Sequence, residues 1–424
     1  MQKKESPVVP VIASLVVMLC VGIIYLWSVF RSPIQATFGM TTTAVTMVAS
    51  VMLFGFVFGT LIGGFINDKK GPRFAAFCGV ILFALGVGLT GLLNENNSGL
   101  IYLTYCVMGG LGSGFAYSAC LSCIQKWLPH RRGFASGIAC AAFGLSTVIF
   151  APVSNTLMNL HQIGTATLGS TETILVNFRA VFFTMAGIFA VVGLIACCLI
   201  RLPKAPIVPP AAEKADGKPA PAARAVRNLT IGQAVRTGFF WCLFFDMFLI
   251  NGTWNLCTPI IKTLGVERGL TPAMAIFAVS FTGIANALGR LAVGALSDKM
   301  GRTNAIILMA VLTILGAIGM TFIGGPAYIV VVAIIAFAYG GPAPLHAAMT
   351  TDFFGPKHFG LNYGCVMLAL GLSSLFFNWI STTFLHSNPL PTFIMGAITA
   401  VIPIILMLLI KRMEKKQAAA PAAE

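Results

Sequence analysis

The chain has 424 residues, of which 57% are hydrophobic and only 9% are charged. Because soluble domains carry about a quarter charged residues, this composition excludes an ordinary water-soluble protein. The formal net charge of +15 is compatible with a nucleic-acid partner, but the positions of the basic residues give a different explanation.

Apolar segments long enough to cross a bilayer as helices recur along the chain, and they lack the alternation expected of membrane barrel strands. We predict an all-α membrane protein with twelve membrane-spanning helices in two pseudo-symmetric halves of six. The first six spans are 8–30, 44–66, 74–93, 99–124, 134–158 and 178–200. The second six are 239–261, 273–296, 303–323, 327–350, 361–384 and 391–410.

These spans divide the chain into four parts. Residues 1–200 form the N-terminal half and residues 238–412 form the C-terminal half. Between them, residues 201–237 are rich in Pro, Ala and basic side chains, which predicts a flexible cytoplasmic linker that ends in a short surface helix at Asn228–Thr237. Residues 413–424 are predicted to be a disordered tail.

The basic residues gather on one side of this topology. An even number of spans places both termini on the same side, and 22 of the 27 Lys and Arg residues fall there. This asymmetry predicts cytoplasmic termini for a multi-pass protein of the cell (inner) membrane, and it removes the argument for nucleic-acid binding. The exceptions are four residues on the outer side and one inside a span: Arg31, Arg179, Lys262, Arg268 and Arg290.

All 11 cysteines fall within predicted spans, and none shows metal-ligand spacing in an aqueous loop. We interpret them as reduced packing residues, and we expect neither a metal nor another cofactor.

One charged hinge motif occurs twice, at a constant offset of 230 residues. The first copy contains Gly64, Asp68 and Gly71, and the second contains Gly294, Asp298 and Gly301. A carboxylate at such a hinge can accept hydrogen bonds from the backbone N–H groups that begin a neighbouring helix, and it can pair with Arg or Lys. We therefore predict that these hinges latch the two halves in one state; the alternative is that the charges only fix topology. The predicted hinge residues are Asp68, Lys69, Arg73, Asp298, Lys299 and Arg302.

Six plus six spans with this hinge after spans 2 and 8 resemble the major facilitator superfamily over essentially the whole chain. Three further segments, 22–28, 125–137 and 352–364, resemble the oxalate–formate antiporter family, the microbial relative of the monocarboxylate transporters. This resemblance implies a secondary transporter that works by alternating access. We expect the chain to act as a monomer.

Arg290 is the strongest candidate for substrate binding. It lies eight residues before Asp298, about 12 Å into the bilayer at 1.5 Å per residue. An isolated Arg at that depth costs several kcal/mol, so it must face a partner or a water-filled path. Asn286 lies one helical turn away, and Arg matches a carboxylate with paired donors. The alternative is a buried structural ion pair, but the resemblance implies that an Arg here binds the substrate carboxylate.

Asp246 is the other charged residue within a span, at about the same depth as Arg290. We leave three interpretations open: it pairs with Arg290, it takes up a proton because burial disfavours a charged carboxylate, or it stays solvated near the span's entrance. His346, near the end of span 10, is interpreted as structural rather than as a proton carrier.

Aromatic side chains with polar tips are the remaining candidate ligand contacts: Tyr25, Trp27, Tyr117 and Tyr339. Tyr117 lies ten residues before Trp127, and the resemblance to the antiporter family implies that this tyrosine faces the substrate. For Trp27 and Tyr339, helix packing is an equal alternative.

One difference from the antiporter pattern limits the range of expected substrates. Oxalate antiporters pair the span-8 arginine with a lysine in span 11, but that position is Leu370 here and span 11 contains no cation. A single fixed positive charge favours a monocarboxylate such as lactate, pyruvate or formate. The prediction is a proton-coupled transporter of small organic anions.

Three other functions compete with this prediction. Anion exchange of the oxalate:formate type, with a counter-anion in place of the proton, stays open. Drug efflux and a non-transporting sensor are weaker alternatives, because the lone Arg speaks against an acidic cavity and the linker is short. The sequence shows no cluster of catalytic residues that would indicate an enzyme. It also shows no phosphate-binding loop that would indicate ATP hydrolysis.

Overall fold

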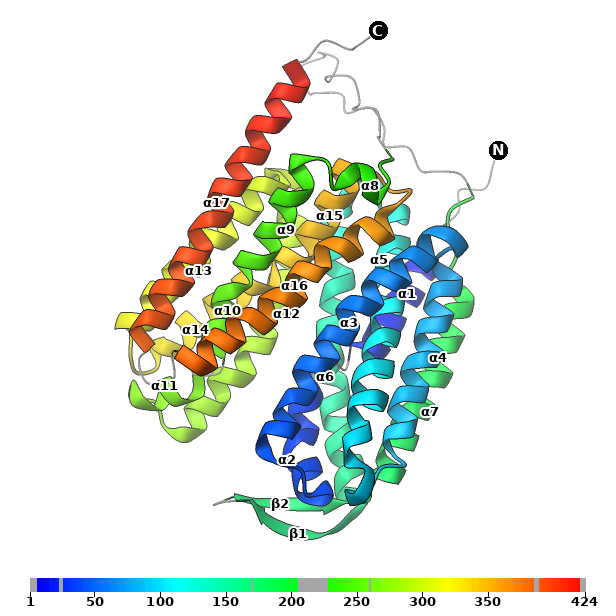
Figure 1. Cartoon of the computed structure of the whole chain (residues 1–424), viewed down its shortest axis with the longest axis vertical. Coiled ribbons are helices and arrows are strands. Elements are labelled where there is room, and N and C mark those ends of the chain that lie inside the picture. Colours follow the sequence, from blue (N-terminus) through cyan, green and yellow to red (C-terminus); the bar gives the residue numbers. More distant parts are fainter. Residues whose placement is uncertain are drawn as a thin grey trace. The chain divides into compact units, whose positions relative to one another are not determined.

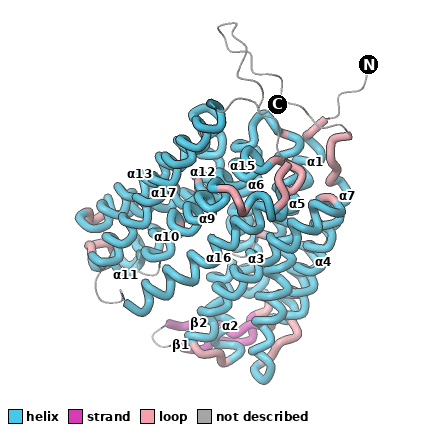
Figure 2. The backbone as a smooth tube through the Cα atoms, turned by 45° about the horizontal axis from the view of Figure 1, so that its top comes forward, coloured by secondary structure: helices cyan, strands magenta, loops and turns pink. Residues whose placement is uncertain are grey.

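The computed structural model describes residues 6–22, 26–168, 171–204, 228–258, 261–384 and 389–419. Nearly all of these residues are helical, as Figure 1 and Figure 2 show. The chain separates into two compact units. Unit 1 comprises Met1–Pro129, Ala142–Val208 and Phe359–Gly364, and unit 2 comprises His130–Ala141, Pro209–His358 and Cys365–Glu424.

Unit 1 holds the first helices of the chain. They are α1 (Val8–Val21), α2 (Trp27–Phe38), α3 (Thr42–Lys70), α4 (Pro72–Thr90), η2 (Glu95–Leu100), the π-helical η3 (Tyr102–Gly109), α5 (Gly110–Trp127), α6 (Arg132–Leu160) from Ala142 onward, and α7 (Phe178–Leu199). Helix α5 packs against both α3 and α4. A hairpin of two antiparallel strands, β1 (Gln162–Leu168) and β2 (Thr171–Val176), joins α6 to α7.

Unit 2 holds the later helices. After the short η4 (Pro129–Arg131), they are α8 (Ile231–Ala234), α9 (Gly238–Ile250), α10 (Gly252–Cys257), α11 (Ile261–Glu267), α12 (Pro272–Met300), α13 (Arg302–Phe322), α14 (Ala327–Gly340), α15 (Pro342–Phe354), α16 (Phe359–Phe384) from Cys365 onward, and α17 (Pro389–Ala419). Its core is apolar and includes Tyr328, Ile335 and Phe393. The first turns of α6 also belong to this unit, whereas the first turns of α16 belong to unit 1.

The sequence repeat is retained in the helix geometry. Helices α3 and α12 each have 29 residues, and each begins after a Thr whose side chain caps the helix (Thr41 and Thr271). Each ends at a glycine with positive φ, 86° at Gly71 and 89° at Gly301. Glycine takes this backbone conformation without the steric cost of a Cβ atom, so the next helix begins at once.

Within the described residues, ten helices are long and apolar enough to cross a membrane. The predicted span 239–261 is interrupted at Asn251, between α9 and α10. In the predicted span 8–30, α1 ends at Val21 and α2 begins at Trp27, and residues 23–25 lie outside the described residues. Asn251 turns its side chain back onto the carbonyl of Met247 at 2.6 Å, a local hydrogen bond that competes with continuation of the helix.

The linker and the tail lie partly outside the described residues. Residues 205–227, the centre of the predicted linker, are among those not described, and α8 falls within the predicted surface helix at Asn228–Thr237. The prediction of a disordered tail from residue 413 was wrong for residues 413–419, because α17 continues to Ala419. Met, Glu, Lys, Gln and Ala in this stretch are all strong helix formers that prolong a helix already begun.

Candidate functional site

The buried guanidinium of Arg290 is fixed by neighbours on two helices of unit 2. Its Nε donates to Oδ1 of Asn286 at 2.9 Å, one turn earlier on α12. Its Nη1 donates to the carbonyl of Cys140, on the first turns of α6, at 2.9 Å. Arg290 is only 7% exposed. The structure therefore brings Arg290 and Asn286 together, and both of these bonds go to uncharged oxygen atoms.

Close contacts between helices position the Arg290 side chain next to its hydrogen-bond partners. The amide of Asn286 also donates to the carbonyl of Ala336 on α14 at 3.3 Å. A Cβ atom at Gly340 would collide with the Asn286 carbonyl, and one at Gly137 would lie 2.7 Å from the Arg290 carbonyl. Glycine at these two positions lets α14 and α6 approach α12 closely enough for the polar side chains to reach their partners.

Asp246 and His346 form a second polar pair in unit 2. Oδ2 of Asp246 on α9 lies 2.8 Å from Nε2 of His346 on α15, and both side chains are completely buried. The interpretation of Asp246 as a solvated carboxylate is therefore wrong. The contact with His346 was not predicted, because the sequence gives no spacing rule that relates two residues 100 positions apart. The available signal was that each is an ionisable residue within a predicted span.

The predicted aromatic contacts have different surroundings. The hydroxyl of Tyr117 lies 3.4 Å from that of Tyr363 at the start of α16, in a buried part of unit 1. The indole of Trp27 donates to the carbonyl of Val45 at 2.9 Å and packs against Tyr105, which favours the packing alternative. Tyr339 stacks on Trp254 with ring centroids 5.1 Å apart. Tyr25 lies outside the described residues.

Each hinge carboxylate binds the beginning of a helix that is distant in sequence. Asp298 accepts from the backbone N–H groups of Gly133 at 3.0 Å and Phe134 at 2.8 Å, which begin α6. Asp68 accepts from those of Gly360 at 3.0 Å and Leu361 at 2.9 Å, which begin α16. A helix N-terminus carries unpaired N–H donors and a partial positive charge, so each carboxylate is well matched to its partner.

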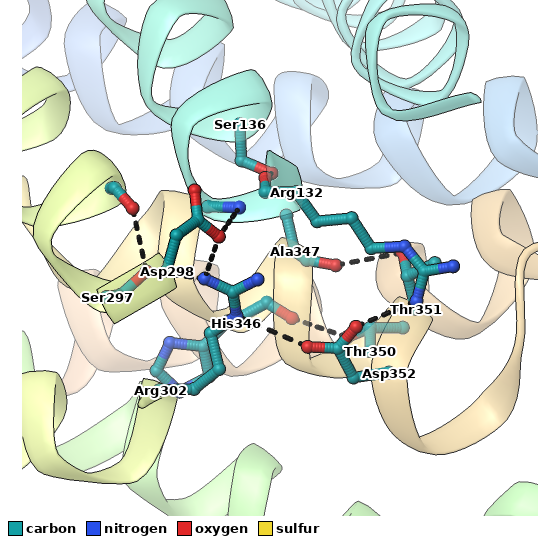
Figure 3. A network of polar contacts seen from close by, with 12 residues as sticks. Arg132, Ser136, Ser297, Asp298, Arg302, His346, Ala347, Thr350, Thr351 and Asp352 are labelled. Atoms are coloured by element: carbon teal, nitrogen blue, oxygen red, sulfur yellow. Dashed lines mark hydrogen bonds and ion pairs between the residues drawn. The ribbon is translucent and has the colours of Figure 1, made fainter. Parts of the chain in front are cut away.

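The second hinge adds a network of ion pairs, shown in Figure 3. Arg302 donates to Asp298 at 2.5 Å and to Asp352 at 3.2 Å. Asp352 also accepts from Arg132 at 2.8 Å, so it joins the start of α6 to the start of α13. Arg132 and Asp352 were not among the predicted hinge residues, although both stand in charged hinges that the sequence shows after spans 4 and 10.

Three predicted hinge residues have other surroundings. Lys69 lies over the ring of Phe65, with Nζ 4.2 Å from its centroid. Lys69, Arg73 and Lys299 are exposed, and among the described residues none of the three forms an ion pair with Asp68 or Asp298. The roles of Lys69, Arg73 and Lys299 at the hinges stay predictions.

The chain has two helical units, an interrupted helix and charged hinges at helix ends. Together these features define a polytopic membrane protein of the secondary-transporter class. The family model of the Major Facilitator Superfamily matches residues 11–345. The chain belongs to that superfamily, as its sequence resemblance predicted.

Several related transporters are similar in sequence over most of the chain. It is 24% identical over 375 residues to the uncharacterized MFS-type transporter YhjX of Escherichia coli, covering 86% of this chain and 85% of the relative. It is 25% identical over 378 residues to the oxalate:formate antiporter of Oxalobacter formigenes, covering 86% and 82%. It is 26% identical over 306 residues to monocarboxylate transporter 13 of Bos taurus, covering 71% and 63%.

Solved structures share the fold. The fucose:proton symporter FucP of E. coli superimposes with a TM-score of 0.70 at 14% identity, covering 96% of this chain and 99% of FucP. The proton:xylose symporter XylE gives a TM-score of 0.70 at 15% identity, covering 95% of each chain. The predicted fold class is confirmed, and the relatives are transporters rather than enzymes.

Proposed function

We propose that this protein is a secondary active transporter of small monocarboxylates of the lactate, pyruvate and formate class, coupled to protons and working by alternating access. The observation that carries the proposal is the buried guanidinium of Arg290, held in place by Asn286 and the Cys140 carbonyl. A charged side chain inside a membrane span costs several kcal/mol, so it is retained where it serves a function.

A carboxylate is the ligand that best suits this guanidinium. Arg presents planar, paired N–H donors that match the two oxygen atoms of a carboxylate. Asn286 and the Cys140 carbonyl orient the guanidinium, and a carboxylate is the ligand whose charge and shape it matches. Tyr117, Tyr339 and Tyr25 are proposed as further ligand contacts, whereas the contacts of Trp27 with Val45 and Tyr105 favour a packing role over ligand binding.

The single cation favours a substrate with one negative charge. Helix α16 carries no Lys or Arg along its length, and Leu370 occupies the position where oxalate antiporters have a lysine. Relatives at 25–26% identity include the apicoplast pyruvate carrier 1 of Toxoplasma gondii and a mammalian monocarboxylate transporter. These names support a carboxylate substrate class, and the missing lysine supports a monocarboxylate within it.

The hinges supply the proposed conformational switch. Asp68 and Asp298 hold the first turns of α16 and α6, and release of these hydrogen bonds would free both helix ends in the alternate state. The distribution of basic residues supports cytoplasmic termini and cytoplasmic hinges, in a protein that acts as a monomer in the inner membrane. The predicted division into halves at 1–200 and 238–412, joined by a cytoplasmic linker, is part of this proposal.

The second candidate is anion exchange, which the similarity to the oxalate:formate antiporter favours. Reconstituted vesicles separate the two. Proton symport predicts uptake of labelled lactate, pyruvate or formate into vesicles with an alkaline interior and no internal anion. Exchange predicts uptake that requires an internal counter-anion and ignores the pH gradient, and that result would overturn proton coupling.

A further inference from the structure

Two titratable side chains meet in the interior of unit 2, and Figure 3 shows one of them, His346, in the polar network of the second hinge. Asp246 and His346 are both completely buried, with Oδ2 and Nε2 2.8 Å apart. Removing a charge from water costs several kcal/mol unless it is paired, so the protonation states of these two groups depend on each other.

The second nitrogen of the imidazole fixes the tautomer of His346. Nδ1 lies 2.8 Å from the carbonyl oxygen of Pro342, one turn earlier on α15. A carbonyl oxygen only accepts, so Nδ1 carries a hydrogen. A neutral imidazole has a single N–H group, so Nε2 would then direct a lone pair at the Asp246 carboxylate. Two acceptors 2.8 Å apart repel, and this close approach therefore favours a state in which one of the two groups carries a further proton.

We propose that Asp246 and His346 bind one proton jointly and that this pair is the proton site of the transport cycle, an assignment that rests on the proposed transport function. When the proton is present, either on Oδ2 or on Nε2, the pair has no net charge. When it leaves, a carboxylate and a neutral imidazole remain, with a net charge of −1. His346 thereby becomes a partner in proton binding rather than a structural residue.

This assignment explains how proton and substrate are coupled. With neither bound, the +1 of Arg290 and the −1 of the empty pair cancel. With both bound, the monocarboxylate cancels Arg290 and the loaded pair is neutral. Binding only one of the two leaves a net charge of +1 or −1 buried in unit 2. Because a net charge within the membrane is costly, the empty and the fully loaded states are the ones able to reorient.

The helices that carry the pair are interrupted close to it. Asp246 lies five residues before Asn251, where α9 gives way to α10. His346 lies four residues after Pro342, which has no N–H group and begins α15 directly after α14. Bending at these two points would part the carboxylate from the imidazole and open the pair for proton exchange.

The neighbouring titratable groups are accounted for. Cys242 lies one turn from Asp246 on α9 and is the titratable side chain nearest to it on that helix. On the helices packed against α9 and α15, Arg290 contacts Asn286 and Cys140, Arg302 contacts Asp298 and Asp352, and Lys411 contacts Asn304. The other Lys and Arg side chains of α12 and α17 are exposed: Lys299, Arg412, Lys415 and Lys416.

Two variants of the full-length protein in vesicles test the proton site. Asp246→Asn mimics the loaded carboxyl, and His346→Gln keeps a polar side chain without a titratable nitrogen. Both are expected to retain counterflow of labelled monocarboxylate, which exchanges fully loaded carriers, and to lose accumulation driven by a pH gradient. Glu95→Gln and His161→Gln, at exposed or half-buried positions away from the pair, serve as controls and are expected to accumulate substrate like the wild type.

A spectroscopic measurement separates this proposal from the proposed function. In ¹⁵N-histidine NMR spectra, the signals lost in His346→Gln should show a protonated Nδ1 at neutral pH. A His346 with a bare Nδ1 and a hydrogen on Nε2 would overturn the shared proton, whatever is transported. Wild-type accumulation by both pair variants would overturn it as well. Absence of counterflow in the wild type with every monocarboxylate would instead overturn the substrate class and leave the NMR result to decide the pair.

Discussion

Asp68 and Asp298, 230 positions apart, each bind two consecutive backbone N–H groups that begin a distant helix. The four distances lie between 2.8 and 3.0 Å. At both places a glycine in the hinge helix faces a glycine in the partner helix, Gly64 with Gly360 and Gly294 with Gly133. The duplication has therefore preserved the contact itself and not only the letters of the motif.

Substitution of Arg290 tests the carboxylate clamp. Arg290→Ala should abolish uptake while the protein still inserts and purifies as a monodisperse species. Arg290→Lys should retain the charge but lose the paired donors, so it should raise KM more than it lowers the maximal rate. Normal uptake by Arg290→Ala would contradict the clamp.

Asn286 should act through the orientation of Arg290. Asn286→Ala removes one hydrogen bond to a charged group, worth about 1.5–3 kcal/mol, and should raise KM by roughly ten- to a hundredfold. Asn286→Asp places a carboxylate beside the guanidinium and should compete with the substrate more severely. A smaller effect of the Asp variant than of the Ala variant, measured by initial uptake rates, would argue against an anion site here.

Of the two carboxylates at the second hinge, Asp298 should stabilise the hinge more than Asp352 does. Asp298→Asn weakens two bonds to a helix N-terminus at a largely buried position and should increase labelling of single cysteines placed at the hinge. Asp352→Asn affects ion pairs whose side chains are 17% and 33% exposed, which are worth about 0–1 kcal/mol, so its effect should be smaller. Equal labelling of both variants would contradict this ranking.

The glycine contacts can be tested on a single helix. Gly294→Ala places a methyl group against the Gly133 carbonyl at 2.5 Å and should disrupt the closed hinge. Gly283→Ala, also on α12, meets nothing within 4 Å and provides the matched control. We expect uptake to fall only in the Gly294 variant; equal uptake by the two variants would show that the close crossing is not required.

Leu370 should determine the charge of the substrate. Leu370→Lys adds the second cation that oxalate antiporters carry in this span, and it should shift the preference from monocarboxylates toward oxalate. Leu370→Met is a control of similar volume with no charge. The measurement is inhibition of labelled pyruvate or formate uptake by unlabelled oxalate. Equal inhibition in the wild type and Leu370→Lys would contradict the claim that the number of positive charges selects the substrate.

Local sequence patterns predicted most of the helices and part of the candidate site. Helical spans, the repeat and the pairing of Arg290 with Asn286 depend on spacings of a few residues or on long apolar runs, which a sequence displays directly. The interruption at Asn251 was not predicted, because apolar composition continues through it. His346, Arg132 and Asp352 were assigned no such role, since their contacts join residues 50 to 220 positions apart and depend on the packing of helices.

The most direct test of the central claim is uptake of labelled lactate, pyruvate and formate into reconstituted vesicles, comparing the wild type with Arg290→Ala under an inward proton gradient. We expect accumulation of at least one monocarboxylate by the wild type, loss of accumulation when the gradient is dissipated, and no uptake by Arg290→Ala. Equal uptake by both proteins, or wild-type uptake of none of the three, would contradict it.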